Sequence, residues 1–221
     1  MPVNVETYQQ IKTECDAQNV TLVAVSKTKP IADILELYNL GQRDFGENYV
    51  QELLEKKEAL PNDIRWHFIG HLQSNKAKFI VPFVHLIHGV DSEKLLQEIN
   101  KQGEKINRVI DCLLQVFIAK EETKFGMDET ELNNLQISKY ANVQILGLMG
   151  MASNTEDKMI VKSEFENLFR IFKQHQLPTA NCQLSTLSMG MSGDYKIAIE
   201  CGSTMIRVGS LLFGERNYPV K

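Results

Sequence analysis

The feature that most constrains the fold is an alternation of strand-like and helix-like stretches that occurs eight times along the chain. Eight such units with short crossovers predict an α/β protein with parallel strands inside and helices outside. A closed (β/α)8 TIM barrel accounts for the number of strands. The alternative, an open doubly wound sheet, more often has about five or six strands and a glycine fingerprint after the first. Here Ser26 to Pro30 follow the first strand and include no glycine.

The expected elements can be placed along the sequence from periodicity and turn residues. Strands are expected at 20–25, 43–45, 64–69, 86–90, 109–119, 143–148, 182–187 and 205–208. Helices are expected at 5–17, 31–40, 49–60, 75–82, 92–105, 129–140, 158–175 and 195–200. The run at 109–119 is apolar on both faces, which is typical of a buried parallel strand. Asp91 or Ser92 is a candidate cap for the start of the helix at 92–105.

The length favours one domain that covers residues 1–221. A chain of 221 residues with 43% hydrophobic content can build one sizeable core and is short for two. No segment rich in Pro, Gly or Ser divides it.

Charge and cysteine usage narrow the class of protein further. The net charge is −4, and basic residues are scattered among acidic ones, so neither nucleic acid nor an anionic membrane is an expected partner. The sequence has no apolar run of about eighteen residues, and we expect a cytoplasmic protein without a membrane span. The four cysteines lack CxxC spacing, which predicts free thiols and neither a disulfide framework nor a metal site.

Two loops near the end of the chain have the composition of a phosphate site. In a (β/α)8 barrel the functional groups lie at the carboxyl ends of the strands, and phosphate commonly binds in the loops after strands 7 and 8. The first loop contains Ser188 and Ser192 with two glycines, and the second contains Gly209 and Ser210. Each could be an ordinary turn, because Gly and Ser are common turn residues. Their occurrence at both expected positions favours an anion site.

Lys27 ends the first strand, which lies beside the last strand in a closed barrel. A lysine amine becomes a nucleophile toward an aldehyde when burial or a nearby cation lowers its pKa, and Arg207 on the last strand is a candidate cation. The alternative is a solvated lysine, and Lys29 fits that description better. Arg207 itself requires a partner. We expect either an ion pair with Glu47 or Asp111 or a ligand.

Other polar residues follow strands 2 and 3. Asn48 and His71 could point into the same site, or each could cap the next helix. Trp66 and Met149 are expected to pack inside the fold.

Six segments of the sequence together resemble the pyridoxal phosphate homeostasis protein family, whose fold is similar to the barrel domain of alanine racemase. These segments are VAVSKTKP (23–30), FGEN (45–48), HFIGHLQSNK (67–76), GLMGM (147–151), LSMGMSGDY with the following GST (187–204), and IRVGSLLFGER (206–216). They span nearly the whole chain in the family's order. The resemblance implies that pyridoxal phosphate (PLP) is the cofactor.

The resemblance also implies a role for individual residues. Lys27 would hold PLP as a Schiff base, and Arg207 would lie beside its pyridine nitrogen with Asn48 near the cofactor. Ser188, Ser192, Gly209 and Ser210 would surround the phosphate. The GLMGM segment adds Met149 to the cofactor-binding candidates.

A carrier is favoured over an enzyme. An arginine beside the ring disfavours the pyridinium that full electron-sink chemistry needs. Racemisation needs a second base, which alanine racemase takes from a separate domain, and the segment from Val208 to Lys221 is too short for one. We therefore expect a PLP-binding protein of intracellular PLP homeostasis with no robust catalysis. It would be a monomer or weak dimer that delivers PLP to apo PLP-dependent enzymes.

Two other functions remain open on the sequence alone. The first is a weak amino-acid racemase or another Schiff-base enzyme, such as an aldolase, on the same barrel. The second is a partner-binding regulator that senses PLP as a ligand.

Overall fold

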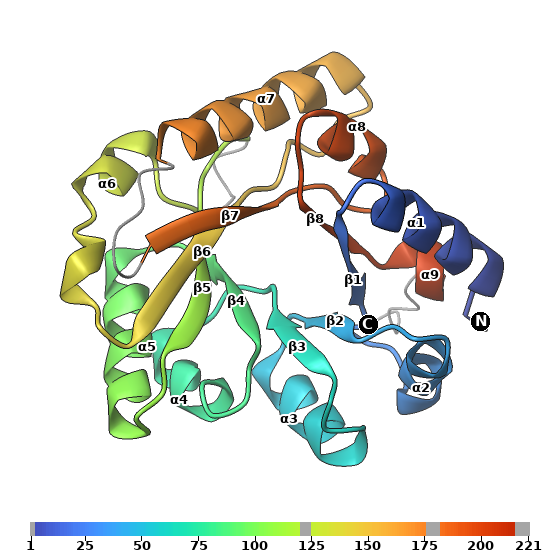
Figure 1. The fold of residues 1–221 in the computed structure, drawn as a ribbon, viewed down its shortest axis with the longest axis horizontal. Helices are drawn as coiled ribbons and strands as arrows, with labels where there is room; N and C mark the ends of the chain where they lie inside the picture. The colour runs from blue at the N-terminus through green and yellow to red at the C-terminus, as the bar shows by residue number, and fades with distance from the viewer. Residues whose placement is uncertain (1–2, 120–124, 176–181, 215–221) are drawn as a thin grey trace, which may run out of the picture.

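The structure is a computed structural model that describes residues 3–119, 125–175 and 182–214. Within these residues, eight parallel strands close into a barrel in the order β1 to β8, with helices around it (Figure 1). β1 pairs with both β2 and β8, so the sheet has no open edge and the doubly wound alternative is excluded. The predicted TIM barrel is confirmed.

The strands and helices lie close to their predicted positions. The strands are β1 (Thr21–Val25), β2 (Asp44–Glu47), β3 (Arg65–Phe68), β4 (Leu86–Val90), β5 (Ile110–Gln115), β6 (Val143–Met149), β7 (Cys182–Ser188) and β8 (Met205–Val208). The helices are α1 (Val5–Ala17), α2 (Ile31–Asn39), α3 (Val50–Ala59), α4 (Ala77–Ile80), α5 (Glu93–Lys105), α6 (Glu129–Asn134), α7 (Lys158–Gln174), α8 (Tyr195–Glu200) and α9 (Ser210–Phe213). Two short 3-10 helices are η1 (Ser74–Lys76) and η2 (Ile137–Lys139).

Side-chain caps set where the longer helices begin. The Ser92 hydroxyl accepts from the Leu95 N–H at the start of α5, which confirms one of the two candidate caps. At the start of α7 the Asp157 carboxylate accepts from the N–H groups of Met159 and Ile160.

Three predicted elements are shorter than expected. β5 ends at Gln115, because the chain then leaves the sheet and Val116 forms a single bridge with Met127. The helix predicted at 129–140 is divided, because Leu135 is extended between α6 and η2. The helix predicted at 75–82 consists of η1 followed by α4.

The barrel interior is partly polar. Its apolar residues form a cluster separate from the large core beneath the helices: Val23, Leu86, Leu113, Met149 and Met205. Residues paired across neighbouring strands share a face of the sheet. Arg207 pairs with Val23, His67 pairs with Leu86, and Ser188 pairs with Met205. These three polar side chains therefore point into the barrel.

The seam between β1 and β8 brings distant parts of the chain together. α1 packs against α9 and β1, and the Asn4 N–H donates to the Leu212 carbonyl at 2.8 Å. The Lys29 amine donates to the carbonyls of Phe213 at 2.7 Å and Gly214 at 3.1 Å. Lys29 was expected to be a solvated lysine, and that prediction is wrong because its side chain holds the turn after β8.

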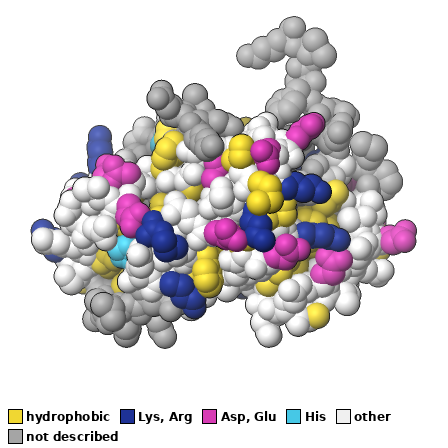
Figure 2. All heavy atoms as spheres, turned by 90° about the horizontal axis from the view of Figure 1, so that it is seen from above, with side chains coloured by type: hydrophobic (Ala, Val, Ile, Leu, Met, Phe, Trp, Pro, Cys, Tyr) yellow, Lys and Arg dark blue, Asp and Glu magenta, His cyan; other side chains and the backbone are white. Residues whose placement is uncertain are grey.

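Acidic and basic side chains are interspersed on the face drawn in Figure 2. The cysteines Cys15, Cys112, Cys182 and Cys201 are buried and free, as predicted. No helix in the described part of the chain combines the length and apolarity needed to cross a bilayer.

Candidate functional site

A cavity of about 250 Å³ lies at the carboxyl ends of β1, β2 and β8. Its lining consists of Val25, Lys27, Asn48, Ile69, Met151, Met191, Ser192, Gly193, Arg207, Gly209 and Ser210. Six of the eight predicted cofactor-binding residues are in this set: Lys27, Asn48, Ser192, Arg207, Gly209 and Ser210. Sequence reasoning missed Met151, Met191 and Gly193, although the last two flank Ser192 in a loop already identified.

The backbone on both sides of Lys27 is held by side chains of α3. The Lys56 amine donates to the Ser26 carbonyl at 2.7 Å, and the Glu52 carboxylate accepts from the Thr28 N–H at 2.6 Å. Thr28 has a φ of 64°, a left-handed conformation that a β-branched residue rarely adopts. Lys27 therefore lies in a turn that α3 fixes, and its side chain reaches the cavity.

The same helix supplies a buried ion network below the turn. The Lys56 amine lies 2.8 Å from Glu47 and 2.7 Å from Glu52, and the Ser26 hydroxyl donates to Glu47 at 2.6 Å. Glu47 is fully buried, and burial raises the pKa of its carboxyl to about 6 even though Lys56 and Ser26 act against it. Glu47 is therefore the partner of Lys56.

Arg207 carries a buried positive charge toward the cavity. Only 4% of its surface is exposed. Its guanidinium donates to the Ser188 hydroxyl at 2.6 Å and to the Gly150 carbonyl at 3.1 Å. Burial lowers the pKa of Arg207 to about 10, so the group stays charged at neutral pH.

The expected ion pair of Arg207 does not form within the described residues. No described carboxylate lies within 4.0 Å of the guanidinium, and Glu47 is instead engaged by Lys56. Asp194 attracts the guanidinium from beyond this distance. Because a buried charge without a directly paired counter-ion is costly, this arrangement favours the ligand-facing interpretation of Arg207.

The two glycine-serine loops form one wall of the cavity. The Gly209 N–H donates to the Ser192 hydroxyl at 3.2 Å, which joins the loop after β7 to the turn after β8. The N–H groups of Ser192, Gly193 and Ser210 donate to no other group among the described residues. No atom lies within 4 Å of the place where a side chain on Gly193 would begin. Free amides beside open space suit an anion.

Asn48 presents a buried acceptor to the site. Its Oδ1 atom is buried and accepts no hydrogen bond from any described residue. The alternative role as a helix cap is wrong, because α3 begins after Tyr49 without a side-chain cap. A buried amide oxygen without a donor indicates a missing partner, and a ligand in the cavity can supply it.

Two predicted residues lie beneath the cavity rather than on its wall. Ser188 is fully buried, and its hydroxyl bonds Arg207 and His88, which corrects the prediction that it surrounds a phosphate. Met149 belongs to the apolar cluster inside the barrel, as its packing interpretation predicted. Its position does not support the alternative of direct ligand contact.

His71 lies outside the site. Its ring bonds Asp91 at 2.9 Å and stacks on Phe125 with ring centroids 4.1 Å apart. It lines a neighbouring cavity with Lys76 and not the cavity of Lys27.

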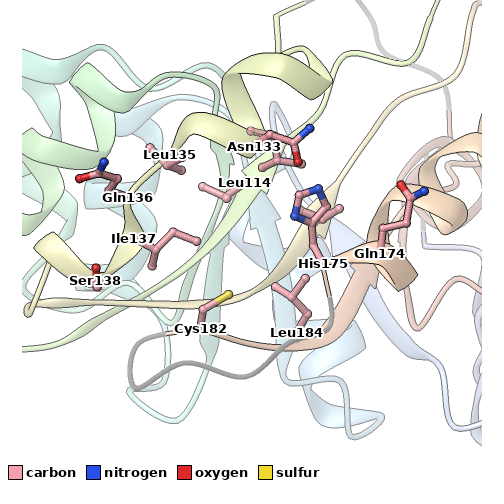
Figure 3. Close-up of a pocket in the computed structure, with 12 residues that line it drawn as sticks. Leu114, Asn133, Leu135, Gln136, Ile137, Ser138, Gln174, His175, Cys182 and Leu184 are labelled. Carbon is pink, nitrogen blue, oxygen red and sulfur yellow. The ribbon is translucent and has the colours of Figure 1, made fainter.

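A larger cavity of about 340 Å³ lies outside the barrel between β5, β6, β7 and the segment that holds α6 and η2 (Figure 3). Apolar side chains such as Leu114, Ile137 and Leu184 line it, together with His175 and Cys182. Its described lining has no lysine or arginine and lies apart from Lys27, so it does not match the predicted anion site.

The cavity of Lys27 thus combines an amine, a buried guanidinium, a wall of free amides and an unpartnered amide oxygen. These groups fit a small anionic ligand that carries a carbonyl group for the amine and a hydrogen-bond donor for Asn48.

Comparison with known proteins shows the family of the chain. Residues 5–217 match the family model of the alanine racemase N-terminal domain. The chain is 38% identical over 220 residues to the pyridoxal phosphate homeostasis protein of Haemophilus influenzae, with 95% of this chain and 93% of the relative covered.

Solved structures extend the agreement to the backbone. PipY of Synechococcus elongatus, solved with PLP bound, is 39% identical with a TM-score of 0.81, and the match covers 89% of this chain and 93% of PipY. Alanine racemase of Bartonella henselae shares the fold, with a TM-score of 0.74 at 19% identity over 100% of this chain and 66% of the racemase.

Proposed function

The chain belongs to the pyridoxal phosphate homeostasis protein family, and from that premise we propose that it binds PLP in the cavity of Lys27 and acts in intracellular PLP homeostasis. The convergence of Lys27, Arg207 and the Ser192 loop on one small cavity carries this proposal. PLP supplies an aldehyde that a lysine amine can bind covalently.

Each residue of the cavity has a proposed role. Lys27 holds the cofactor as a Schiff base, because its amine is the primary amine on the wall of the cavity. Arg207 faces the ring nitrogen, and its fixed positive charge keeps that nitrogen unprotonated. Asn48 accepts a hydrogen bond from the ring hydroxyl, which would satisfy its buried Oδ1.

The phosphate is assigned to the wall formed by the two loops. The N–H groups of Ser192, Gly193 and Ser210 are available donors, and the hydroxyls of Ser192 and Ser210 add to them. Gly209 lets this wall lie close to β1, because a Cβ at this position would lie 3.3 Å from the Cβ and the carbonyl oxygen of Val25.

The composition of the lining favours carriage over turnover. Among the described residues around the cavity, none is a tyrosine, histidine, cysteine or carboxylate that could serve as a second base opposite Lys27. An unprotonated ring nitrogen also disfavours carbanion chemistry. We propose that the protein holds and releases PLP, with apo PLP-dependent enzymes as recipients, and that amino-acid racemisation is at most weak.

Reduction with borohydride tests the covalent link. The purified protein incubated with PLP should be yellow, and borohydride should bleach it and leave a pyridoxyl mass on the peptide that contains Lys27. Lys27→Ala should lose this mass. Lys76→Ala, which removes an exposed lysine on the same rim, should keep it. A reducible chromophore that survives Lys27→Ala would overturn the assignment.

A separate measurement tests carriage against catalysis. Exchange of the α-proton of alanine or serine in deuterated water should be far slower than in an amino-acid racemase. Turnover at ordinary enzymatic rates, about 1–1000 per second, would instead identify an enzyme. Transfer is tested by mixing the loaded protein with an apo PLP-dependent enzyme and following the recovery of that enzyme's activity.

A further inference from the structure

A chain of hydrogen bonds runs through the barrel interior from the floor of the cavity to the amino-terminal end of β2. The Arg207 guanidinium lies 2.6 Å from the Ser188 hydroxyl, which lies 3.1 Å from Nδ1 of His88. Nε2 of His88 lies 2.9 Å from Nδ1 of His67, and Nε2 of His67 lies 3.0 Å from Asp44. We call these five residues the barrel relay.

The barrel relay is enclosed by protein. Ser188, His67 and His88 have no exposed surface, and the apolar cluster inside the barrel surrounds them. In such a low-dielectric interior an unmade hydrogen bond is costly, so all four links are expected to be formed.

When both imidazoles are neutral, the two ends of the barrel relay fix the direction of every hydrogen bond in it. A guanidinium only donates. Burial would raise the pKa of Asp44, but hydrogen bonds from His67 and Arg65 outweigh it and hold this pKa well below its usual range, so the carboxylate only accepts. Burial lowers the pKa of His88 far below its ordinary value, so His88 is neutral. When His67 carries a single proton, that proton lies on Nε2 and points at Asp44, so both imidazoles donate from Nε2 and accept at Nδ1.

This direction of the hydrogen bonds changes the acceptor strength of the Ser188 hydroxyl, which contacts the Arg207 guanidinium. The Ser188 hydroxyl donates a hydrogen bond to Nδ1 of His88. Hydrogen bonds in a chain strengthen one another, by roughly 10–30% per bond. The Ser188 oxygen therefore becomes a stronger acceptor for the guanidinium. No described carboxylate lies within 4.0 Å of the Arg207 guanidinium, and the barrel relay links it through Ser188, His88 and His67 to the charge of Asp44.

We propose that Asp44, His67 and His88 are positioning residues that orient the Ser188 hydroxyl and, through it, the guanidinium of Arg207 toward the ring of the bound ligand. The proposal rests on the proposed function, because the ligand is taken to be PLP. A metal ion at Asp44 is not required, since Arg65 and His67 already engage both carboxylate oxygens.

The first test is made on the ligand-free protein. Nitrogen-15 NMR of the histidine side chains distinguishes the two neutral tautomers from the protonated ring, and His67 and His88 can be assigned by single substitutions. Both should be neutral Nε2–H tautomers at neutral pH. A proton on Nδ1 of either ring would overturn the polarity.

The second test uses variants of the loaded protein. His88→Leu should shift the absorption maximum of bound PLP and weaken its binding roughly tenfold, as expected for one lost link to a charged group. His88→Gln retains one acceptor and one donor, so it should restore most of both properties. Leu86→Ala, two residues earlier in β4, removes apolar packing beside the barrel relay but none of its hydrogen-bonding groups, so it should leave the spectrum unchanged.

The outcomes separate the two proposals. If the wild-type protein forms no borohydride-reducible adduct with PLP, the proposed function fails, while the tautomer measurement still decides the polarity. If the wild type binds PLP and a folded His88→Leu variant keeps the same spectrum and affinity, the positioning role is wrong. Ser188→Ala repeats the test in case His88→Leu does not fold.

Discussion

Replacing Lys56 by methionine should destabilise the protein strongly at neutral pH and less at acidic pH. Lys56 is 5% exposed and donates to Ser26, Glu47 and Glu52 at 2.7–2.8 Å. Its loss leaves the fully buried Glu47 without its cationic partner, and the other carboxylate oxygen of Glu47 already lacks a described partner. Removing one member of a buried ion pair costs about 3–5 kcal/mol.

The expected shift in melting temperature follows from this energy. For a domain of about 150–250 residues, 1 kcal/mol corresponds to about 2–4 °C. Lys56→Met should therefore lower the Tm of the ligand-free protein by about 6–20 °C at pH 7.5. Lys57→Met is the matched control, because this neighbour on α3 has a side chain that is 37% exposed, with a 4.0 Å contact to Glu58 and a 5.8 Å approach to the Phe83 ring. It should change stability by less than about 0.5 kcal/mol.

The pH dependence identifies Glu47 as the cause. In the wild type, burial raises the pKa of Glu47 from 4.5 to about 6, so the folded state holds this proton more tightly than the unfolded state. The free energy of unfolding consequently falls as pH rises between these values, by about 2 kcal/mol. Without Lys56 the pKa of Glu47 rises further, because the Lys56 ammonium lowers this pKa in the wild type.

The loss measured for Lys56→Met should therefore be smaller at pH 5.5 than at pH 7.5, by about 1–2 kcal/mol. Urea titrations at both pH values measure it, and adding Glu47→Gln should recover much of the stability at pH 7.5. A loss below about 1 kcal/mol, or an equal loss at both pH values, would refute the reasoning.

Three further predictions concern the turns and the thiols. Gly70→Ala should weaken PLP binding in an absorbance titration, because the new Cβ would clash with the Asn48 carbonyl and displace the cavity wall. Unchanged binding would show that the wall can move. Thr28→Asn should raise the free energy of unfolding by about 0.5–1 kcal/mol, since asparagine tolerates the left-handed conformation better, and a loss in urea titration would contradict this. The four cysteines should react with a thiol reagent only after unfolding, because all four are buried. Burial raises the pKa of the Cys15 thiol to about 11 and raises that of Cys112 further. Fast labelling of the native protein would disprove their burial.

Periodicity predicted the barrel well because each strand and helix buries one or both faces in a regular pattern. It failed where burial continues without regular structure. The run from Val116 to Ala119 is as apolar as β5, but it packs in a loop that bridges Met127. A short apolar run does not distinguish a strand from a buried loop.

The cavity was predictable because a closed barrel gathers the carboxyl ends of its strands. The role of Ser188 was not predictable from the sequence, because a serine at this position in a loop motif can face a ligand or point into the barrel. The barrel relay had a weak signal in the sequence. His67 and His88 are polar residues within strands that are buried on both faces, and such positions require a hydrogen-bond partner.

The pairing of β1 with β8 also governs when the protein can acquire a ligand during its synthesis. A ribosome adds about 5–20 residues per second, so Lys27 is made on the order of ten seconds or more before Gly209. A nascent chain that ends before β8 has the amine but lacks the opposing guanidinium and the wall that binds the anion. On the proposed function, we therefore expect PLP to bind after synthesis, once the barrel has closed.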